Sequence, residues 1–244
     1  MPIAFAHRGG SAFPENSWRA FEHAVGLGYS YLETDVHATA DGVLIAFHDK
    51  TLDRVTDAAG AVARLPYRAV AAARIGGSEP IPLLADLLAA WPGIRFNIDV
   101  KDFPAVGPLT GVLARAAAWD RVCVTSFSGR RLAAVRRALP RPVCLAASPA
   151  GIAAVRLGLP AAALAAGFAR SWVRCAQVPA GVATAPFIRR AHAAGLQVHV
   201  WTVNDRAAMT ALLELGVDGI MTDETATLRD VLAQRDQWHP RAVG

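Results

Sequence analysis

Short β-rich runs alternate with alanine-rich helical stretches along almost the whole sequence. Strands that alternate with helices pair in parallel through crossover helices, so this alternation predicts an α/β fold with a parallel sheet. Eight such units in 244 residues match the size of a (β/α)₈ TIM barrel. A doubly wound open sheet is the rival, but no GxGxxG motif follows the first strand, which disfavours it. The predicted strands are Ile3–Ala6, Tyr31–Val36, Arg95–Val100, Arg121–Thr125, Pro142–Ala146, Val173–Val178, Val198–Val203 and Val217–Thr222.

One region interrupts the alternation directly after the second predicted strand. Residues 37–49 read HATADGVLIAFHD, and Asp41-Gly42 is a strong hairpin signal between two extended arms. A two-residue turn there would place His48 opposite Asp35, and a longer turn would shift that register by a residue or two. In either case the second arm returns His48 to the end of the second strand.

The stretch from Lys50 to Pro82 contains one short predicted helix and otherwise irregular structure. No low-complexity linker marks a domain boundary. We therefore predict a single domain over residues 1–244, with residues 37–82 forming a hairpin and a small inserted excursion near one end of the barrel.

Composition supports a globular enzyme and argues against several other classes. Hydrophobic residues make up 53% of the chain and charged residues 18%, which is enough to bury a substantial core. Apolar runs are too short to span a bilayer, and the N-terminus lacks the features of a signal peptide. The net charge of +5 comes from scattered arginines and indicates no nucleic-acid partner. We expect a cytoplasmic protein without stable membrane insertion that acts on a small molecule; its oligomeric state is left open.

The three cysteines are far apart in the sequence and form no CxxC pair. Each falls in or beside a predicted buried strand, so we expect small core residues, and neither a zinc site nor a disulfide is predicted. These residues are Cys123, Cys144 and Cys175.

Carboxylates gather at the ends of the second and third predicted strands. Glu33 and Asp35 are two residues apart and therefore share a face, and Asp99 ends the next strand of the barrel. Adjacent like charges are costly unless a cation or basic side chains neutralise them. Three carboxylates suit a hard divalent ion, Ca²⁺ or Mg²⁺, with Mn²⁺ as a further possibility. The alternative is a set of unrelated surface acids at strand ends.

Two histidines reach the same neighbourhood. His7 follows the first strand, and His48 returns along the hairpin. A histidine pair can divide acid and base roles near neutral pH. Arg8 would hold an anionic oxygen, while Gly9 and Gly10 allow the backbone to approach a ligand closely. Taken singly, either histidine could instead be packed in a turn.

Two further residues are candidates for substrate binding. Lys101 is one of only two lysines in an arginine-rich chain and lies two residues after Asp99, which suggests that a compact ammonium is needed there. Trp201 ends the seventh predicted strand and could form a pocket wall or simply pack. All of these strand ends lie on the side where barrel active sites occur.

Several motifs resemble the glycerophosphodiester phosphodiesterase family, in the same order and over residues 3 to about 225. They are HRGGSAFPENSWRAF, YLETDVHATADGVLIAFHDKTLDRVTD, IPLLADLL, FNIDVK, VHVWTVND and GVDGIMTDE. The resemblance implies a phosphodiesterase barrel of the PI-phospholipase-C-like type, a divalent metal, and hydrolysis of glycerophosphodiesters to sn-glycerol 3-phosphate and an alcohol.

Position by position, the resemblance also implies roles. His7 and His48 correspond to the acid–base pair, Arg8 to the phosphate-binding arginine, and Lys101 to the basic residue near the phosphate. Glu33 and Asp35 correspond to metal ligands. The third ligand is usually Glu, and Asp99 stands in its place, one methylene shorter.

Two other functions are compatible with the sequence. The same machinery could act as a lysophospholipase D, with the alanine-rich stretch Ala146–Phe168 lining an acyl groove. The chain could also be a non-catalytic phosphate-binding barrel, but the intact histidines and acids argue against that reading. The alcohol group, the metal, the attacking group and the assignment of acid and base to the two histidines are left open.

Overall fold

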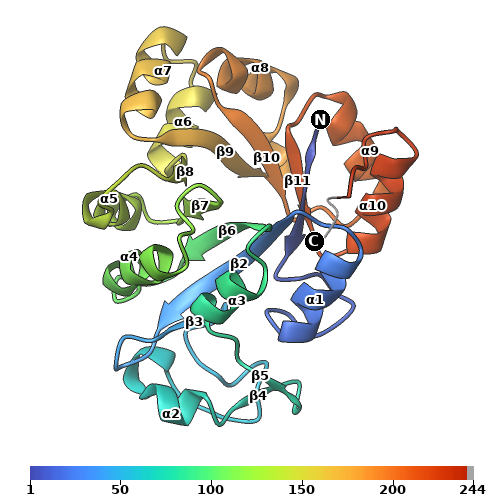
Figure 1. Cartoon of the computed structure of the whole chain (residues 1–244). Coiled ribbons are helices and arrows are strands. Elements are labelled where there is room, and N and C mark those ends of the chain that lie inside the picture. The colour runs from blue at the N-terminus through green and yellow to red at the C-terminus, as the bar shows by residue number, and fades with distance from the viewer. Residues whose placement is uncertain (241–244) are drawn as a thin grey trace.

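Eight parallel strands form a closed ring in the computed structural model, which describes residues 1–240 (Figure 1). The last four residues of the predicted domain lie outside the described range. The ring closes because β1 pairs in parallel with both β11 and β2. The predicted (β/α)₈ barrel is therefore confirmed. Around the ring the strands are β1 (Ile3–His7), β2 (Tyr31–Ala38), β6 (Arg95–Val100), β7 (Val122–Thr125), β8 (Cys144–Ala146), β9 (Val173–Pro179), β10 (Gln197–Trp201) and β11 (Gly219–Thr222).

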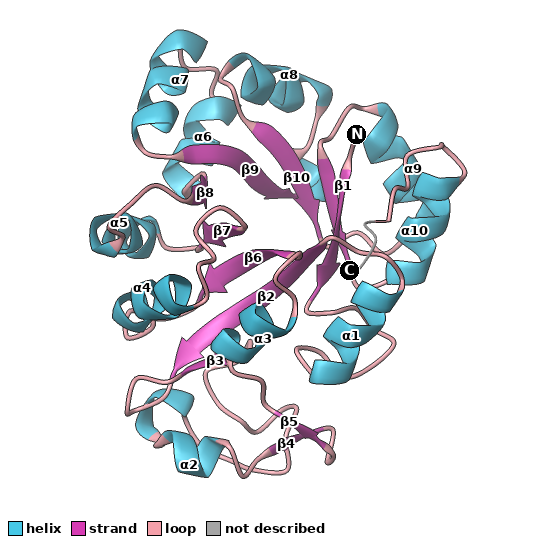
Figure 2. Cartoon of the chain, in the orientation of Figure 1, coloured by secondary structure: helices cyan, strands magenta, loops and turns pink. Residues whose placement is uncertain are grey.

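Helices surround the ring on its outside (Figure 2). Alternate strand residues such as Leu32, Ile98 and Val200 point outward and are fully buried beneath them, which accounts for the apolar half of each strand's pattern. Two helices connect β8 to β9. The helices are α1 (Trp18–Gly26), α3 (Leu84–Ala90), α4 (Val106–Arg115), α5 (Gly129–Ala138), α6 (Pro149–Arg156), α7 (Ala161–Arg170), α8 (Ala185–Ala193), α9 (Arg206–Glu214) and α10 (Thr225–Ala233).

The register of the strands aligns the polar side chains at their carboxyl ends. Asp35 on β2 pairs directly with Asp99 on β6, and His7 on β1 pairs with Glu33 on β2. The inward faces of neighbouring strands therefore bring the acids predicted from the sequence to one end of the barrel.

The predicted hairpin exists, but its register differs by one residue from the two-residue turn. Strand β3 (Leu44–Ala46) runs antiparallel to β2, and the amide of Phe47, not of His48, bonds the carbonyl of Asp35 at 2.9 Å. The loop has three residues because the Thr39 side chain bonds Asp41 and the Val43 amide, while Gly42 takes a φ of +80°. A left-handed glycine in the last loop position is typical of three-residue hairpins.

The rest of the excursion packs on a small apolar cluster of its own. It includes a 3₁₀ turn (Val62–Arg64), the short predicted helix α2 (Tyr67–Val70), and the two-stranded β4 (Arg74–Ile75) and β5 (Glu79–Pro80). Ile45, Phe47 and Leu52 belong to the buried cluster beneath it. The excursion therefore fixes the chain on either side of His48.

Within residues 1–240, no helix has the length and apolar character needed to cross a membrane.

Candidate active site

The carboxyl ends of the strands surround a cavity of about 390 Å³. All of the residues predicted from the sequence to bind, ligate or catalyse contribute to its lining. They are His7, Arg8, Glu33, Asp35, His48, Asp99, Lys101 and Trp201.

His7 is held by a carboxylate that follows β11, the strand beside β1. Its Nδ1 lies 2.7 Å from Oδ1 of Asp223, and its Nε2 lies 3.8 Å from Oε2 of Glu33. Burial lowers the pKa of His7, but the charges of Glu33 and Asp223 outweigh it, and the net pKa is raised. Because Asp223 occupies Nδ1, the Nε2 edge of the ring is the one that faces the cavity.

The role of Asp223 was not predicted from the sequence. It follows β11, which adjoins β1 only because the barrel closes. Asn204 fixes it twice, donating from Nδ2 to Asp223 Oδ2 at 2.9 Å and accepting from the Asp223 amide at 2.9 Å. Both residues follow predicted strands, but the sequence alone does not show that they adjoin His7.

His48 is also held through Nδ1 by a carboxylate, that of the next residue in the chain. Its Nδ1 lies 2.6 Å from Oδ1 of Asp49. Arg54 donates to both oxygens of Asp49, at 2.5 and 3.0 Å, and to Glu15 at 2.6 Å. Hydrogen bonds from Arg54 hold the pKa of Asp49 well below its usual range. His37 also supports this segment, with its Nε2 3.1 Å from the carbonyl oxygen of His48.

A lysine links two of the three buried acids. Lys101 Nζ lies 2.8 Å from Asp35 Oδ1 and 2.6 Å from Asp99 Oδ2. Glu33, which receives no such contact, has its pKa raised to about 7 by burial and by the charge of Asp35. Over the described residues, Oδ1 of Asp99 is buried with no hydrogen-bond partner.

The three carboxylates are of the type that binds a hard cation, although in this structure their oxygens do not all lie close enough together to share one ion. Among residues 1–240, the oxygens of Glu33, Asp35 and Asp99 do not form a set with every pair within 4.8 Å. Asp99 has a buried oxygen without a partner among the described residues, and the pKa of Glu33 is raised. Both observations indicate that the negative charge of these acids is not fully balanced by nearby positive charge. A hard divalent ion would satisfy both with ligands of the type it prefers.

Arg8 enters the cavity from a strained position. Its φ is +52°, and its Nε lies 3.0 Å from Asp35 Oδ2, at an angle that does not meet hydrogen-bond geometry. Its Nη1 donates to Glu15 at 3.2 Å. Glu15 thus pairs with Arg8 and Arg54 and connects the first turn to the His48 segment.

The turn after Arg8 requires glycine, and we expect Gly9→Ala to lower the free energy of unfolding by about 2–4 kcal/mol. Gly9 has a φ of +88°, and a Cβ there would stand 2.7 Å from the backbone carbon of Ala20. Urea unfolding measures the change. The matched control is Gly26→Ala in α1, where nothing lies within 4 Å of the added carbon; it should stabilise by about 0.5–1 kcal/mol. Equal effects of the two substitutions would contradict the steric argument.

An aromatic wall completes one side of the cavity. The rings of Trp201 and Phe127 meet edge to face with centroids 5.4 Å apart, and Lys101 Nζ lies 5.5 Å from the centre of the Phe127 ring. Phe127 is 65% exposed, so this wall continues from the cavity to the surface. It can contact the apolar part of a bound molecule.

A model of the Glycerophosphoryl diester phosphodiesterase family matches residues 7–227. The chain belongs to this family. It is 43% identical over 248 residues to the "Probable glycerophosphodiester phosphodiesterase 2" of Mycobacterium tuberculosis, covering 97% of this chain and 92% of that protein. It is 24% identical to a human lysophospholipase D, covering 93% of this chain and 85% of that protein.

Solved structures share the fold. A phosphodiesterase from Oleispira antarctica, determined in complex with the product sn-glycerol 3-phosphate, superposes with a TM-score of 0.80 at 21% identity, covering 96% of this chain and 97% of that one. Family membership makes this chain a glycerophosphodiester phosphodiesterase, a phosphoric diester hydrolase. Members of the family generally depend on a divalent metal.

Proposed function

We propose that this site hydrolyses a glycerophosphodiester to sn-glycerol 3-phosphate and an alcohol, with His7 and His48 as the acid–base pair. The observation that carries the proposal is that both imidazoles line one cavity and are each anchored through Nδ1 by a carboxylate. A carboxylate at Nδ1 fixes the proton on that nitrogen and leaves Nε2 to exchange a proton with the substrate.

Proton transfer is divided between the two rings. One imidazole takes the proton from the attacking hydroxyl, which is water or the glycerol hydroxyl of the substrate. The other donates a proton to the oxygen of the departing alcohol. In-line displacement places the attacking and leaving oxygens on opposite sides of phosphorus, so the rings must approach from two directions. His7 ends β1, whereas His48 lies two residues beyond β3, so the two rings reach the cavity from different elements, which supports this arrangement.

Glu33, Asp35 and Asp99 would hold the divalent ion, Ca²⁺, Mg²⁺ or Mn²⁺. When bound, such an ion supplies neutralisation of charge on the phosphoryl oxygens. Arg8 and Lys101 add positive charge from the protein. The Arg8 guanidinium offers donors to a phosphate oxygen, and the Lys101 ammonium is oriented by Asp35 and Asp99.

A coupled assay for glycerol 3-phosphate tests the function directly. The enzyme would be given glycerophosphocholine, glycerophosphoethanolamine, glycerophosphoglycerol and glycerophosphoinositol, each with Ca²⁺, Mg²⁺ or Mn²⁺. We expect stoichiometric glycerol 3-phosphate from at least one diester. Binding of the diesters without turnover under every metal would favour a phosphate-binding barrel instead.

The aromatic wall supports a second candidate, cleavage of lysophospholipids at the same bond. Phe127 and Trp201 offer apolar surface, and Ile152 on α6 also lines the cavity. An acyl chain would need such a surface. The enzyme is therefore also given lysophosphatidylcholine below its micellar concentration, and release of choline is measured, because this cleavage yields lysophosphatidic acid and choline and no glycerol 3-phosphate. A kcat/KM for choline release above that of glycerophosphocholine would make the lysolipid the preferred substrate.

Asp223 is a positioning residue for His7, and we expect Asp223→Asn to lower kcat by about 10- to 100-fold. Asparagine keeps the size and can still contact Nδ1, but it removes the charge that fixes the imidazole. Because Asp223 does not line the catalytic cavity, KM should change by less than about threefold. Asp223→Glu, which keeps the charge, should recover part of kcat. A loss confined to KM would show that Asp223 acts on substrate binding instead.

A further inference from the structure

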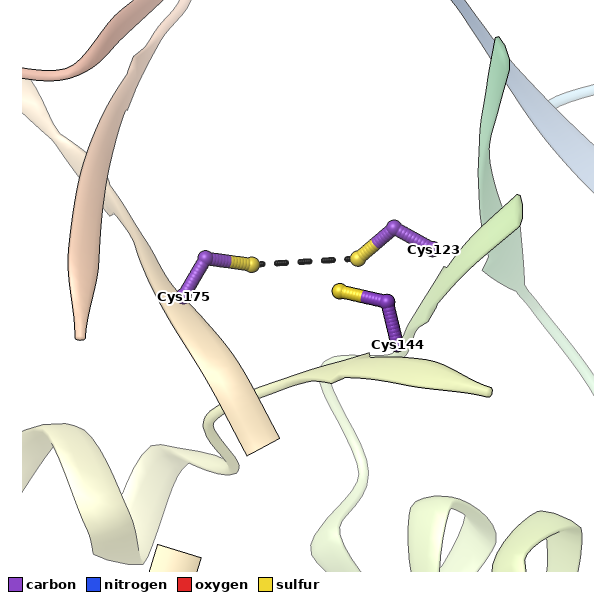
Figure 3. Close-up of side chains that lie close together, drawn as sticks. All are labelled: Cys123, Cys144 and Cys175. Atoms are coloured by element: carbon purple, nitrogen blue, oxygen red, sulfur yellow. Dashed lines mark hydrogen bonds between the residues drawn. The ribbon is translucent and has the colours of Figure 1, made fainter. Parts of the chain in front are cut away.

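Three thiols that are widely separated in the sequence meet inside the barrel (Figure 3). Every pair of the sulfurs of Cys123, Cys144 and Cys175 lies within 4.8 Å, and the Cys123 and Cys175 sulfurs are 3.7 Å apart. All three residues are free cysteines. The sequence led us to expect small core residues, and it did not indicate that the three sulfurs meet.

The meeting follows from the register of three consecutive strands. Cys123 on β7 pairs directly with Cys144 on β8. Cys175 on β9 pairs with Ala146 after a shift in register. Cys123 and Cys175 lie two residues before Thr125 and Gln177, which line the catalytic cavity, so they point to the same interior at a deeper level.

The spacing of the sulfurs is that of ligands around one ion. Metal–thiolate bonds of about 2.3 Å place sulfurs roughly 3.8–4.0 Å apart in tetrahedral or trigonal geometry. The observed separations, from 3.7 Å to at most 4.8 Å, bracket this range. They are far above the length of about 2.05 Å of a disulfide bond. Only a small inward movement of the side chains is needed to bind an ion.

A histidine beside the cluster carries an unused lone pair. The Nε2 of His199 on β10 contacts Gln197 at 3.3 Å, whereas its Nδ1 is buried and, in the described part of the chain, has no hydrogen-bond partner. The Cδ2 edge of the ring lies against Gly219 on β11, and Nδ1 is on the opposite edge of the ring. Burial lowers the pKa of His199 to about 4, which keeps the ring neutral.

An ion could reach the cluster from the far end of the barrel. A second cavity, of about 220 Å³, is lined by Cys123, Cys144 and His199 together with residues at the starts of the strands, such as Tyr31 and Gln197. It is separate from the catalytic cavity, which none of the cysteines lines.

We propose that Cys123, Cys144 and Cys175 form a binding site for one thiophilic d¹⁰ cation of the Zn²⁺ class, distinct from the catalytic centre. Thiolates are soft ligands that select Zn²⁺ and Cu⁺, whereas the hard ion expected in the upper cavity prefers carboxylates. Each ligating thiol gives up its proton to solvent as its sulfur binds the ion. His199 lines the same cavity as Cys123 and Cys144, but it does not belong to the set of ligand atoms that all lie within 4.8 Å of one another, so the three thiolates are the protein ligands and solvent would complete the coordination.

Cadmium is the probe, because its thiolate complexes absorb in the ultraviolet where Zn²⁺ is silent. The reduced protein, stripped of metal, would be titrated with Cd²⁺ and then with Zn²⁺ as competitor. We expect a charge-transfer band that saturates at one thiolate-bound Cd²⁺ per chain and that Zn²⁺ abolishes, together with release of protons. Single Cys123→Ser, Cys144→Ser and Cys175→Ser variants should each weaken binding by at least about tenfold.

Matched variants separate this site from the catalytic one. Asp35→Asn should leave the Cd²⁺ band unchanged, and the triple Cys→Ala variant should lose it. Circular dichroism and thermal unfolding of each single serine variant check that the barrel is intact. Absence of a band in the folded wild type would overturn the proposal. So would equal Cd²⁺ affinity of the wild type and the triple variant, or loss of the thiols to a Cys123–Cys175 disulfide in place of metal binding.

Discussion

Replacing His48 or His7 with alanine is expected to lower kcat by about 10²- to 10⁴-fold, the usual contribution of a general acid or base. Each ring presents Nε2 to the cavity because Asp49 or Asp223 occupies its Nδ1. Alanine removes the proton carrier and leaves the acids, Arg8 and Lys101 in place, so substrate binding should change much less than turnover. Steady-state kinetics with the best diester of the panel measures both.

His192→Ala is the matched control for these substitutions. His192 is also paired with a carboxylate, its Nε2 lying 2.7 Å from Asp218, but it is on α8 and 42% exposed. Its loss should leave kcat within about twofold of wild type, because a surface histidine touches no reacting group. If His7→Ala or His48→Ala behaved like His192→Ala, the two-histidine mechanism would be wrong.

The second large effect is expected from exhaustive chelation of divalent ions, which should lower turnover by at least about 100-fold. A divalent ion contributes several kcal/mol to stabilising charge in the transition state, and each 1.4 kcal/mol or so is worth a factor of ten. The buried acids Glu33, Asp35 and Asp99 leave a site that only a cation can fully neutralise. The assay follows loss of activity in EDTA and its recovery with Ca²⁺, Mg²⁺ and Mn²⁺ added separately.

The cysteine cluster provides the control for chelation, since EDTA would also remove a thiophilic ion. The triple Cys→Ala variant should lose and recover activity as the wild type does, because its catalytic acids are intact. Full activity of wild type after dialysis against chelator would argue against an essential ion. A chelation effect that vanished in the triple variant would assign the dependence to the thiol site.

The barrel was predictable because its signal is local and repeated. Each strand is indicated by a pattern of only four to eight consecutive residues. For example, β6 (Arg95–Val100) has the bounds that the sequence predicts. The hairpin register was less accessible, because the side chain of Thr39 bonds across the loop and adds one residue to the turn. Propensity at Asp41-Gly42 indicates that a turn occurs but does not determine its length.

Part of the candidate site could likewise be predicted from local sequence, and part of it could not. Acids two residues apart on one strand, such as Glu33 and Asp35, share a face by geometry alone. The partner of His7 could not be read in this manner, because Asp223 is 216 positions away and adjoins it only when the ring closes. The meeting of the three cysteines was not predicted for a similar reason, since spacing along the sequence does not reveal neighbours on adjacent strands.

Asn97 and Gln177 form a hydrogen bond across the barrel interior, in which Gln177 Nε2 donates to Asn97 Oδ1 at 2.7 Å. Asn97 borders both cavities, and Gln177 also touches the sulfur of Cys175 at 3.8 Å. This pair of amides therefore lies between the catalytic cavity and the cavity that the thiols line. Substitutions in the cavity that the thiols line should therefore leave diester cleavage unchanged. A metal sensor or a stabilising metal site could be engineered there without loss of the catalytic activity.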